Sequence, residues 1–169
     1  MRLITTCLLL WCLAACTSVV AGAASDTATF VVVRHAEKAD DGSRDPPLNA
    51  AGQSRAKALA QRLAHSGLVA VYATPFRRTQ QTAQVVAASA GLPVTTYAAD
   101  TAASDFAALL RARYRQGTVL VVGHSNTVPE IVASLCSCRI AVLDENAYDG
   151  IYTIRIGPDG KAALDVGRQ

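Results

Sequence analysis

Blocks of apolar and polar positions alternate along this chain and predict strands and helices in turn. Two apolar, β-branched runs, 30–33 and 118–122, are typical of buried strands. Between such runs, apolar residues recur at helical spacing, as at Ala56, Leu59 and Leu63. The sequence therefore predicts an α/β protein.

The rest of the pattern assigns the other strands and helices. Strands are expected at 29–34, 68–73, 93–97, 118–122, 150–156 and 162–166, and helices at 50–65, 75–90, 105–115 and 128–135. Asn49 and Ser104 are expected to cap two of the helices. Alternating elements of this kind predict a three-layer α/β/α sandwich with a mostly parallel central sheet. A closing hairpin, turned by Pro158-Asp159-Gly160, is expected to add antiparallel strands at one edge.

The first 15 residues have the pattern of a signal peptide. Met1-Arg2 gives a positive start, and the apolar stretch 3–15 is shorter than a membrane span requires. Leu13-Ala14-Ala15-Cys16 matches a bacterial lipobox, which predicts lipidation at Cys16. Ala21-Gly22-Ala23 offers an ordinary cleavage site as the alternative. We expect an exported protein anchored at a membrane surface by this lipid, on the periplasmic side or in the cell envelope.

The expected organisation is then residues 1–15 as signal peptide, 16–28 as a small, polar tether and 29–169 as one domain. The formal net charge of the whole chain is +3, and removal of residues 1–15 lowers it to +2 because one arginine and no acid are lost. A net charge this close to zero gives no indication of nucleic-acid binding. Cys136 and Cys138 would remain, as incidental residues, as an i,i+2 disulfide or in a functional role.

Unusual residues fall at the ends of three expected parallel strands. Arg34-His35 ends the first strand, Arg77-Arg78 follows the second at a helix start, and His124 ends a later one. Because the carboxyl ends of parallel strands share one edge of a sheet, these side chains can meet in one crevice. A cluster of cations needs an anion, and a phosphoryl group bound at a helix N-terminus is a suitable one.

The chain here resembles the histidine phosphatase superfamily, which has the phosphoglycerate-mutase-like fold. The similarity rests on four motifs in family order: Val33 to Lys38, Pro47 to Gln53, Thr74 to Ala83 and Val121 to Asn126. They are spread over most of residues 29–167. The resemblance implies that the chain is a phosphatase, and it places this chain beside a small exported bacterial branch of the superfamily.

The resemblance also implies roles for four residues. His35 would be the nucleophile that becomes a phosphohistidine, while Arg34, Arg78 and His124 would bind the phosphoryl oxygens. The family spacing, four residues from Thr74 and four from the Thr-Ala pair at 82–83, favours Arg78 over Arg77. No metal or other cofactor is implied, because arginines supply the positive charge. His65 is expected to be structural.

The general acid is the point at which the sequence departs from the family that it resembles. Mutase-type members carry a glutamate between the second arginine and the second histidine, and phytase-type members carry an aspartate directly after that histidine. This chain has neither. Glu37, Asp100 or no dedicated acid remain as alternatives, and a good leaving group needs little acid help.

The function predicted from the sequence is hydrolysis of a phosphomonoester through a phosphohistidine. The substrate would be a phosphorylated small molecule or a phosphorylated glycan or protein group. The short loops disfavour a phytase or a mutase. The alternative is a catalytically weak or inactive module that binds phosphate on the same fold.

Overall fold

In the computed structural model of the protein, residues 26–169 are described. The expected signal peptide, the lipobox at Cys16 and most of the tether lie outside these described residues, and stay predictions. Among residues 26–169, no helix has the length and hydropathy needed to cross a membrane.

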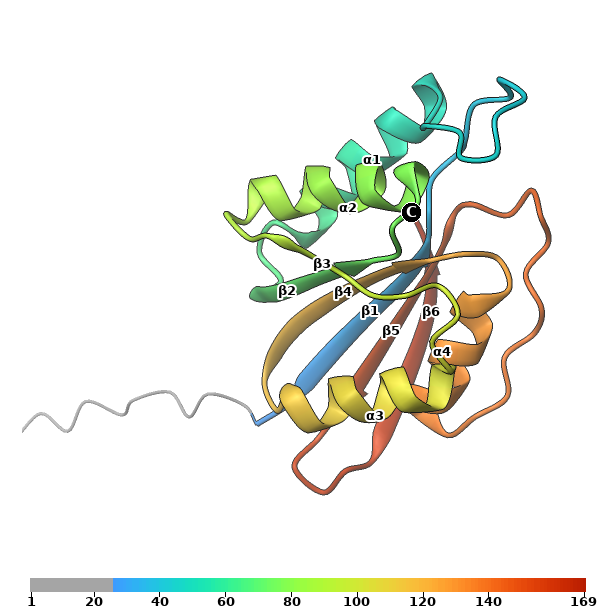
Figure 1. Ribbon diagram of the computed structural model, residues 1–169. Helices are drawn as coiled ribbons and strands as arrows, with labels where there is room; N and C mark the ends of the chain where they lie inside the picture. Colours follow the sequence, from blue (N-terminus) through green and yellow to red (C-terminus); the bar gives the residue numbers. More distant parts are fainter. Residues whose placement is uncertain (1–25) are drawn as a thin grey trace, which may run out of the picture.

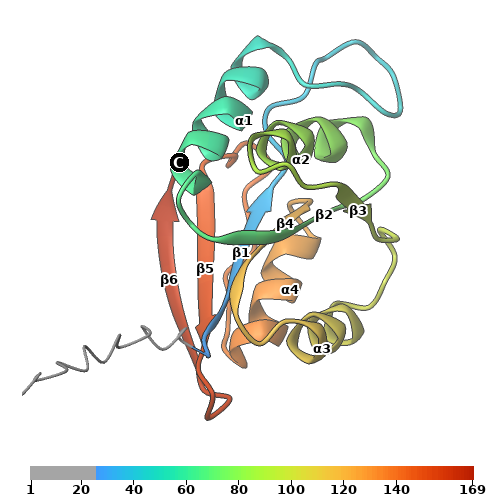
Figure 2. The same cartoon turned by 90° about the vertical axis from the view of Figure 1, so that its left-hand side faces the viewer.

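Within the described residues, six strands form one mixed sheet in the order β3-β2-β4-β1-β5-β6. The strands are β1 (Ala28–Arg34), β2 (Leu68–Ala73), β3 (Val94–Thr96), β4 (Gly117–Gly123), β5 (Gly150–Ile156) and β6 (Ala162–Arg168). β1, β2, β3 and β4 are parallel, and β5 and β6 add an antiparallel hairpin beside β1. Figure 2 shows this hairpin at one edge of the sheet. The predicted fold class is confirmed, with the hairpin making the sheet mixed.

The helices of the described region cover both faces of the sheet (Figure 1). They are α1 (Ala50–Leu63), α2 (Arg77–Ser89), α3 (Ala103–Arg113) and α4 (Thr127–Cys136). Alternate β1 side chains divide between the faces: Phe30 and Val32 pack in the core with α3 and α4, and Val31 and Val33 in the core with α1 and α2. Strands buried on both faces explain the continuous apolar runs in the sequence.

The two expected helix caps have different outcomes. Asn49 caps α1 as predicted, since its side-chain oxygen accepts from the backbone N–H of Gly52 at 2.9 Å. The expectation for Ser104 was wrong, because α3 begins at Ala103, earlier than the expected 105, and Ala102 is its N-cap without a side-chain hydrogen bond. Ala102 closes the first turn through its backbone alone, since the N–H of Phe106 donates to the carbonyl of Ala102 at 3.0 Å.

A short antiparallel bridge fixes the chain just after β1. Lys38 pairs with Leu48 across the loop 39–47. Gly52, in the first turn of α1, lies against this segment, and a Cβ at that position would collide with the backbone carbonyl of Glu37. The absence of a side chain at residue 52 is therefore what lets α1 start this close to the end of β1.

Cys136 and Cys138 form a disulfide at the carboxyl end of α4. Of the three alternatives that the sequence left open for this pair, the structure has the i,i+2 disulfide. Ser137, between the two cysteines, adopts a left-handed conformation with φ of 54°. The crosslink closes the end of α4 directly before the loop 139–149, which returns the chain to β5.

Candidate active site

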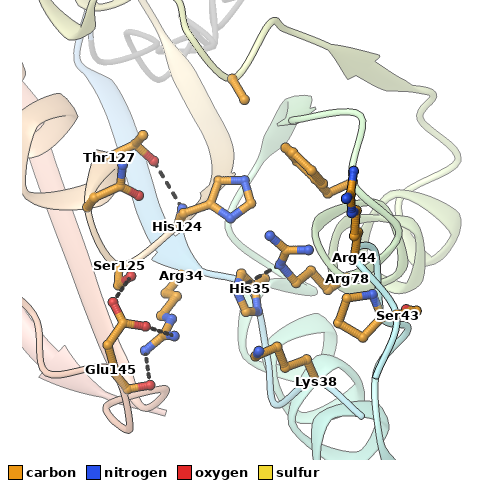
Figure 3. Close-up of a pocket in the computed structure, with 14 residues that line it drawn as sticks. Arg34, His35, Lys38, Ser43, Arg44, Arg78, His124, Ser125, Thr127 and Glu145 are labelled. Atoms are coloured by element: carbon orange, nitrogen blue, oxygen red, sulfur yellow. Dashed lines mark hydrogen bonds and ion pairs between the residues drawn. The ribbon is translucent and has the colours of Figure 1, made fainter. Parts of the chain in front are cut away.

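The candidate site lies where β1, β2 and β4 end. Arg34 and Gly123 are register partners in the parallel pair β1–β4, and the backbone N–H of His35 donates to the carbonyl of Gly123 at 2.9 Å. His35 and His124 thus leave the sheet side by side, with ring centroids 5.4 Å apart. Arg78, in the first turn of α2, reaches the same place from the end of β2 (Figure 3).

His35 is buried, with 3% of its surface exposed, and its ring is held in one tautomer. Nδ1 lies 2.8 Å from the carbonyl oxygen of Ala36, which can only accept, so Nδ1 carries the proton. The Nε–H of Arg78 points at Nε2 from 3.3 Å. Burial, with the charges of Arg34, His124 and Arg78, lowers the pKa of His35 to about 3, against the opposing hydrogen bond to Ala36. At neutral pH, Nε2 therefore has a lone pair.

Arg34 is a buried cation, 4% exposed, held by the loop 139–149. Its Nη1 donates to the carbonyls of Asp144, Glu145 and Ala147 at 3.1, 2.7 and 3.3 Å, and its Nη2 donates to the Glu145 carboxylate at 3.2 Å. The Tyr148 ring covers the guanidinium at 4.1 Å. The Nε–H of Arg34 is buried and has no partner within residues 26–169. A buried donor of this kind is costly unless a ligand completes it.

Arg78 and His124 complete the group of four. Arg78 is 3.5 Å from the carboxylate of Asp45 and lies over the ring of Phe76 at 4.6 Å. Burial and the charges of Arg78 and Arg34 lower the pKa of His124 to about 4. Both histidines are therefore neutral at pH 7, although two guanidiniums flank them.

Two buried hydroxyls hold the inner nitrogen of His124. Its Nε2 is 2.9 Å from the hydroxyl of Thr74, which is 2.8 Å from the hydroxyl of Thr79. The Thr79 hydroxyl donates to the carbonyls of Thr74 and Phe76, so it accepts from the Thr74 hydroxyl. The Thr74 hydroxyl is left to accept from the Nε2–H of His124. Thr74 and Thr79 belong to the motif that follows β2, and they orient the ring toward the other three residues.

The four residues line a cavity of about 380 Å³. Its other charged lining residues are Lys38, Arg44 and Glu145. Glu145 accepts from the hydroxyl of Ser125 at 2.7 Å as well as from Arg34. The cavity is thus strongly cationic and can hold an anion. Within residues 26–169, no three His, Cys, Asp or Glu side chains are grouped to hold a metal ion.

Neither acid proposed from the sequence lines this cavity. Arg55 holds the Glu37 carboxylate with contacts of 2.6 to 3.0 Å, and these bonds lower the pKa of Glu37. Asp100 is exposed beside Ala99, which does line the cavity. Arg77 and His65 are also exposed and lie outside it, Arg77 as the family spacing indicates.

Sequence reasoning missed the loop 139–149. Glu145, Tyr148 and three backbone carbonyls of this loop hold Arg34 from more than 100 positions away in the chain. No periodicity or motif marks the segment, and carbonyls that act as ligands leave no signal in the residue type. The one available signal was the acid itself, Glu145, which lies after His124 and thus outside the intervals where the family carries its acids.

One protein-family model matches part of this chain. Residues 30–100 match the model of the histidine phosphatase superfamily (branch 1). Over 71 residues the chain is 38% identical to the probable phosphoglycerate mutase GpmB of Yersinia enterocolitica, which covers 38% of this chain and 33% of that protein. The chain thus spans about a third of the length of this curated relative.

Solved structures share the fold over most of this chain. The protein histidine phosphatase SixA complexed with tungstate is 21% identical, with a TM-score of 0.65 over 83% of this chain and 96% of its own. A mycobacterial glucosyl-3-phosphoglycerate phosphatase is 18% identical, with a TM-score of 0.67 over 84% and 99%. A phosphoserine phosphatase from Entamoeba histolytica is 16% identical, with a TM-score of 0.63 over 84% and 98%.

The buried neutral histidines predict a loss of stability in mild acid. Because the folded state lowers both pKa values below the ordinary 6.5, the unfolded chain binds protons first. The stability contribution is complete above about pH 6.5 and is lost as pH falls toward the folded values of about 3 and 4. We expect urea unfolding of the double variant His35→Asn/His124→Asn to depend less on pH between these limits than that of the wild type.

The exposed His65 gives the matched control, since His65→Asn removes a histidine outside the cavity. Its unfolding curve should follow the wild type. Carboxylates contribute equally to all three proteins, so the difference between the curves isolates the two buried rings. Parallel curves for the double variant and the wild type would contradict the assignment of neutral histidines.

Proposed function

We propose that this chain is a metal-independent phosphomonoester hydrolase of the histidine phosphatase superfamily and that it works through a phosphohistidine intermediate. The observation that carries the proposal is the state of His35. Its Nδ1 proton is committed to the carbonyl of Ala36, and its Nε2 lone pair lies in a cationic cavity. A neutral imidazole held in this way is a competent nucleophile at neutral pH.

The cations around His35 suit the charge of a phosphoryl group. Arg34 offers its Nε–H, which has no partner among residues 26–169, and Arg78 offers the Nε–H that faces His35. His124 adds a ring nitrogen once a bound anion raises its affinity for a proton. Phosphoryl transfer depends mainly on positioning and on charge stabilisation, and these residues supply both.

The proposed reaction has two displacements. His35 Nε2 attacks the phosphorus, the bond from phosphorus to the leaving oxygen breaks, and the leaving group departs with the electron pair. Water then attacks the phosphohistidine, the phosphorus–nitrogen bond breaks, and orthophosphate and neutral His35 are released. Overall, water gives one proton to the leaving oxygen and its hydroxyl to phosphate. Guanidiniums bear the developing charge, so no step requires a metal ion.

We further propose that no carboxylate acts as a dedicated acid in the first displacement. Arg55 holds Glu37 outside the cavity, and Asp100 is exposed to solvent. Glu145 lines the cavity, but Arg34 and Ser125 bind its two carboxylate oxygens. Substrates with good leaving groups are therefore favoured, such as acyl phosphates or a phosphorylated imidazole.

The alternative is a phosphate-binding module with little or no turnover. One observation favours it, the lack of a free carboxylate on the cavity wall within residues 26–169. The intact group of Arg34, His35, Arg78 and His124 favours the enzyme. Phosphate binding alone would not require a nucleophilic lone pair, so turnover separates the two functions.

Purified protein is expected to hydrolyse p-nitrophenyl phosphate, as measured by release of p-nitrophenol. His35→Ala should lower kcat/KM by about a thousandfold or more, because the nucleophile is lost. His65→Ala, the same change outside the cavity, should retain activity, and EDTA should leave the rate unchanged. Phosphate binding without turnover between pH 5 and 8 would support the non-catalytic module instead.

Aryl and alkyl phosphates whose leaving groups differ in pKa test the absence of a dedicated acid. We expect log(kcat/KM) to fall steeply as the leaving-group pKa rises, because the departing oxygen bears its full charge. The slope should be the same in Glu37→Gln, Asp100→Asn and Glu145→Gln as in the wild type. A variant that steepens the slope would identify its residue as the acid and would overturn this part of the proposal.

We propose also that the protein is exported and held at a membrane by a lipid on Cys16. The short apolar stretch 3–15 and the lipobox that follows it support this location. The disulfide Cys136–Cys138 supports export as well, because such bonds persist in oxidising compartments. A domain of this kind would act on phosphorylated molecules in the cell envelope.

Cys16→Ser should move the full-length protein from the membrane fraction of a bacterial host to the soluble periplasmic fraction. Loss of the thiol removes the acceptor of the lipid but leaves the fold intact. Cys12→Ser, within the apolar stretch, is the matched control and should stay with the membrane. Cleavage after Ala23, found by N-terminal sequencing, would contradict lipidation and favour the ordinary signal site.

A further inference from the structure

The cavity continues past the four central residues to two more cations. Lys38 and Arg44 line the same cavity as His35, and neither forms an ion pair among residues 26–169. In Figure 3 both lie on the side of Arg78, away from Ser125 and Glu145. One phosphoryl group is already served by Arg34, Arg78 and the two histidines. The additional positive charge has no function in the displacement itself.

Backbone hydrogen bonds fix the positions of Lys38 and Arg44. The Lys38–Leu48 bridge closes the base of the loop 39–47, and the N–H of Leu48 donates to the side chain of Gln81 in α2 at 2.7 Å. Farther along the loop, the N–H of Ser43, beside Arg44, donates to the Asp41 carboxylate at 3.0 Å. The loop is thus tied to α2 and to itself, and it presents both cations to the cavity.

The acids of this loop do not neutralise the two cations. Asp40 and Asp41 do not line the cavity, and Asp45 contacts Arg78 and the backbone N–H of Arg77. The opposite wall carries Glu145, whose carboxylate is paired with Arg34. The charge along the cavity is therefore asymmetric, with an unpaired positive wall formed by Lys38 and Arg44 among residues 26–169 and an ion pair on the other side.

We propose that Lys38 and Arg44 form a subsite for a second anionic group on the substrate. The preferred substrates are phosphomonoesters whose leaving portion carries a carboxylate or another phosphate, with this group directed to the positive wall. The inference rests on the proposed phosphatase function and narrows its substrate class. Exposed ion pairs are individually weak, so two of them give a preference of about tenfold rather than an absolute requirement.

Matched esters test the subsite. The carboxyphenyl phosphates and carbamoylphenyl phosphates, each as para and meta isomers, have nearly the same shape and differ by one negative charge. Because the pKa of the phenol also differs, each rate is first divided by the rate that the leaving-group series gives for that pKa. We expect wild-type kcat/KM to be about tenfold higher for the carboxylate of at least one isomer pair at low salt. The ratio should fall toward one in 0.5 M NaCl, because salt screens exposed charges. Phenyl phosphate substituted with a second phosphate distinguishes a carboxylate preference from a bisphosphate preference.

Variants assign the preference to the two residues. Lys38→Ala and Arg44→Ala should each lower the ratio of carboxylate to carboxamide several-fold, and the double variant should bring it close to one. Arg77→Ala removes a cation from the same region, but one that lies outside the cavity, and should retain the wild-type ratio. Circular dichroism of each variant checks that the exposed substitutions leave the fold unchanged.

The outcomes distinguish failure of the proposed phosphatase function from failure of the proposed subsite. Hydrolysis of neither ester by the wild type would overturn the phosphatase function, and the subsite with it. Hydrolysis of both esters at equal rates would overturn the subsite alone. A charge preference that Arg77→Ala lowers as much as Lys38→Ala would show a general field of the protein instead of a subsite, and would also overturn the inference.

Discussion

The parallel pairing of β1 with β4 is the constraint on which the site depends. β1 is held in register on both sides, by β4 and by the antiparallel β5. The hydrogen bond from His35 to Gly123 extends the β1–β4 ladder by one residue, so both histidines leave the sheet at the same level. A slip of one residue would turn every side chain to the opposite face and separate them. The core packing that fixes the register of β1 therefore also fixes the relative positions of His35 and His124.

The second constraint is electrostatic. Two guanidiniums and two imidazoles share a largely buried space, and the imidazoles avoid charge repulsion by staying neutral. Carbonyls of the loop 139–149 and the carboxylate of Glu145 offset the charge of Arg34, yet its Nε–H has no partner in the described part of the chain. An unmade buried hydrogen bond costs about 1–3 kcal/mol. A bound anion that accepts from this N–H would remove that cost.

These two constraints explain what the sequence could predict. Strand ends are readable from apolar runs, and the rule that parallel strands end at one edge places Arg34, His35 and His124 together. The helix start after β2 brings both Arg77 and Arg78 to this edge, and the spacing of the family that the chain resembles selects Arg78. Three other features depend on tertiary contacts: the α3 start at Ala103, the ion pair that draws Glu37 toward Arg55, and the contribution of Glu145. A carboxylate near a nucleophile in the sequence need not face it in space.

The two loops that border the cavity are held in different ways, and this affects how variants are interpreted. The loop 39–47 is tied to α2 through Leu48 and Gln81, independently of the cations it presents. The loop 139–149 is held by Arg34 itself, through three carbonyls and one carboxylate. Replacement of Arg34 therefore releases a loop as well as removing a cation, whereas replacement of Lys38 or Arg44 removes a charge alone. Loss of activity on substitution of Arg34 measures both roles of that residue together.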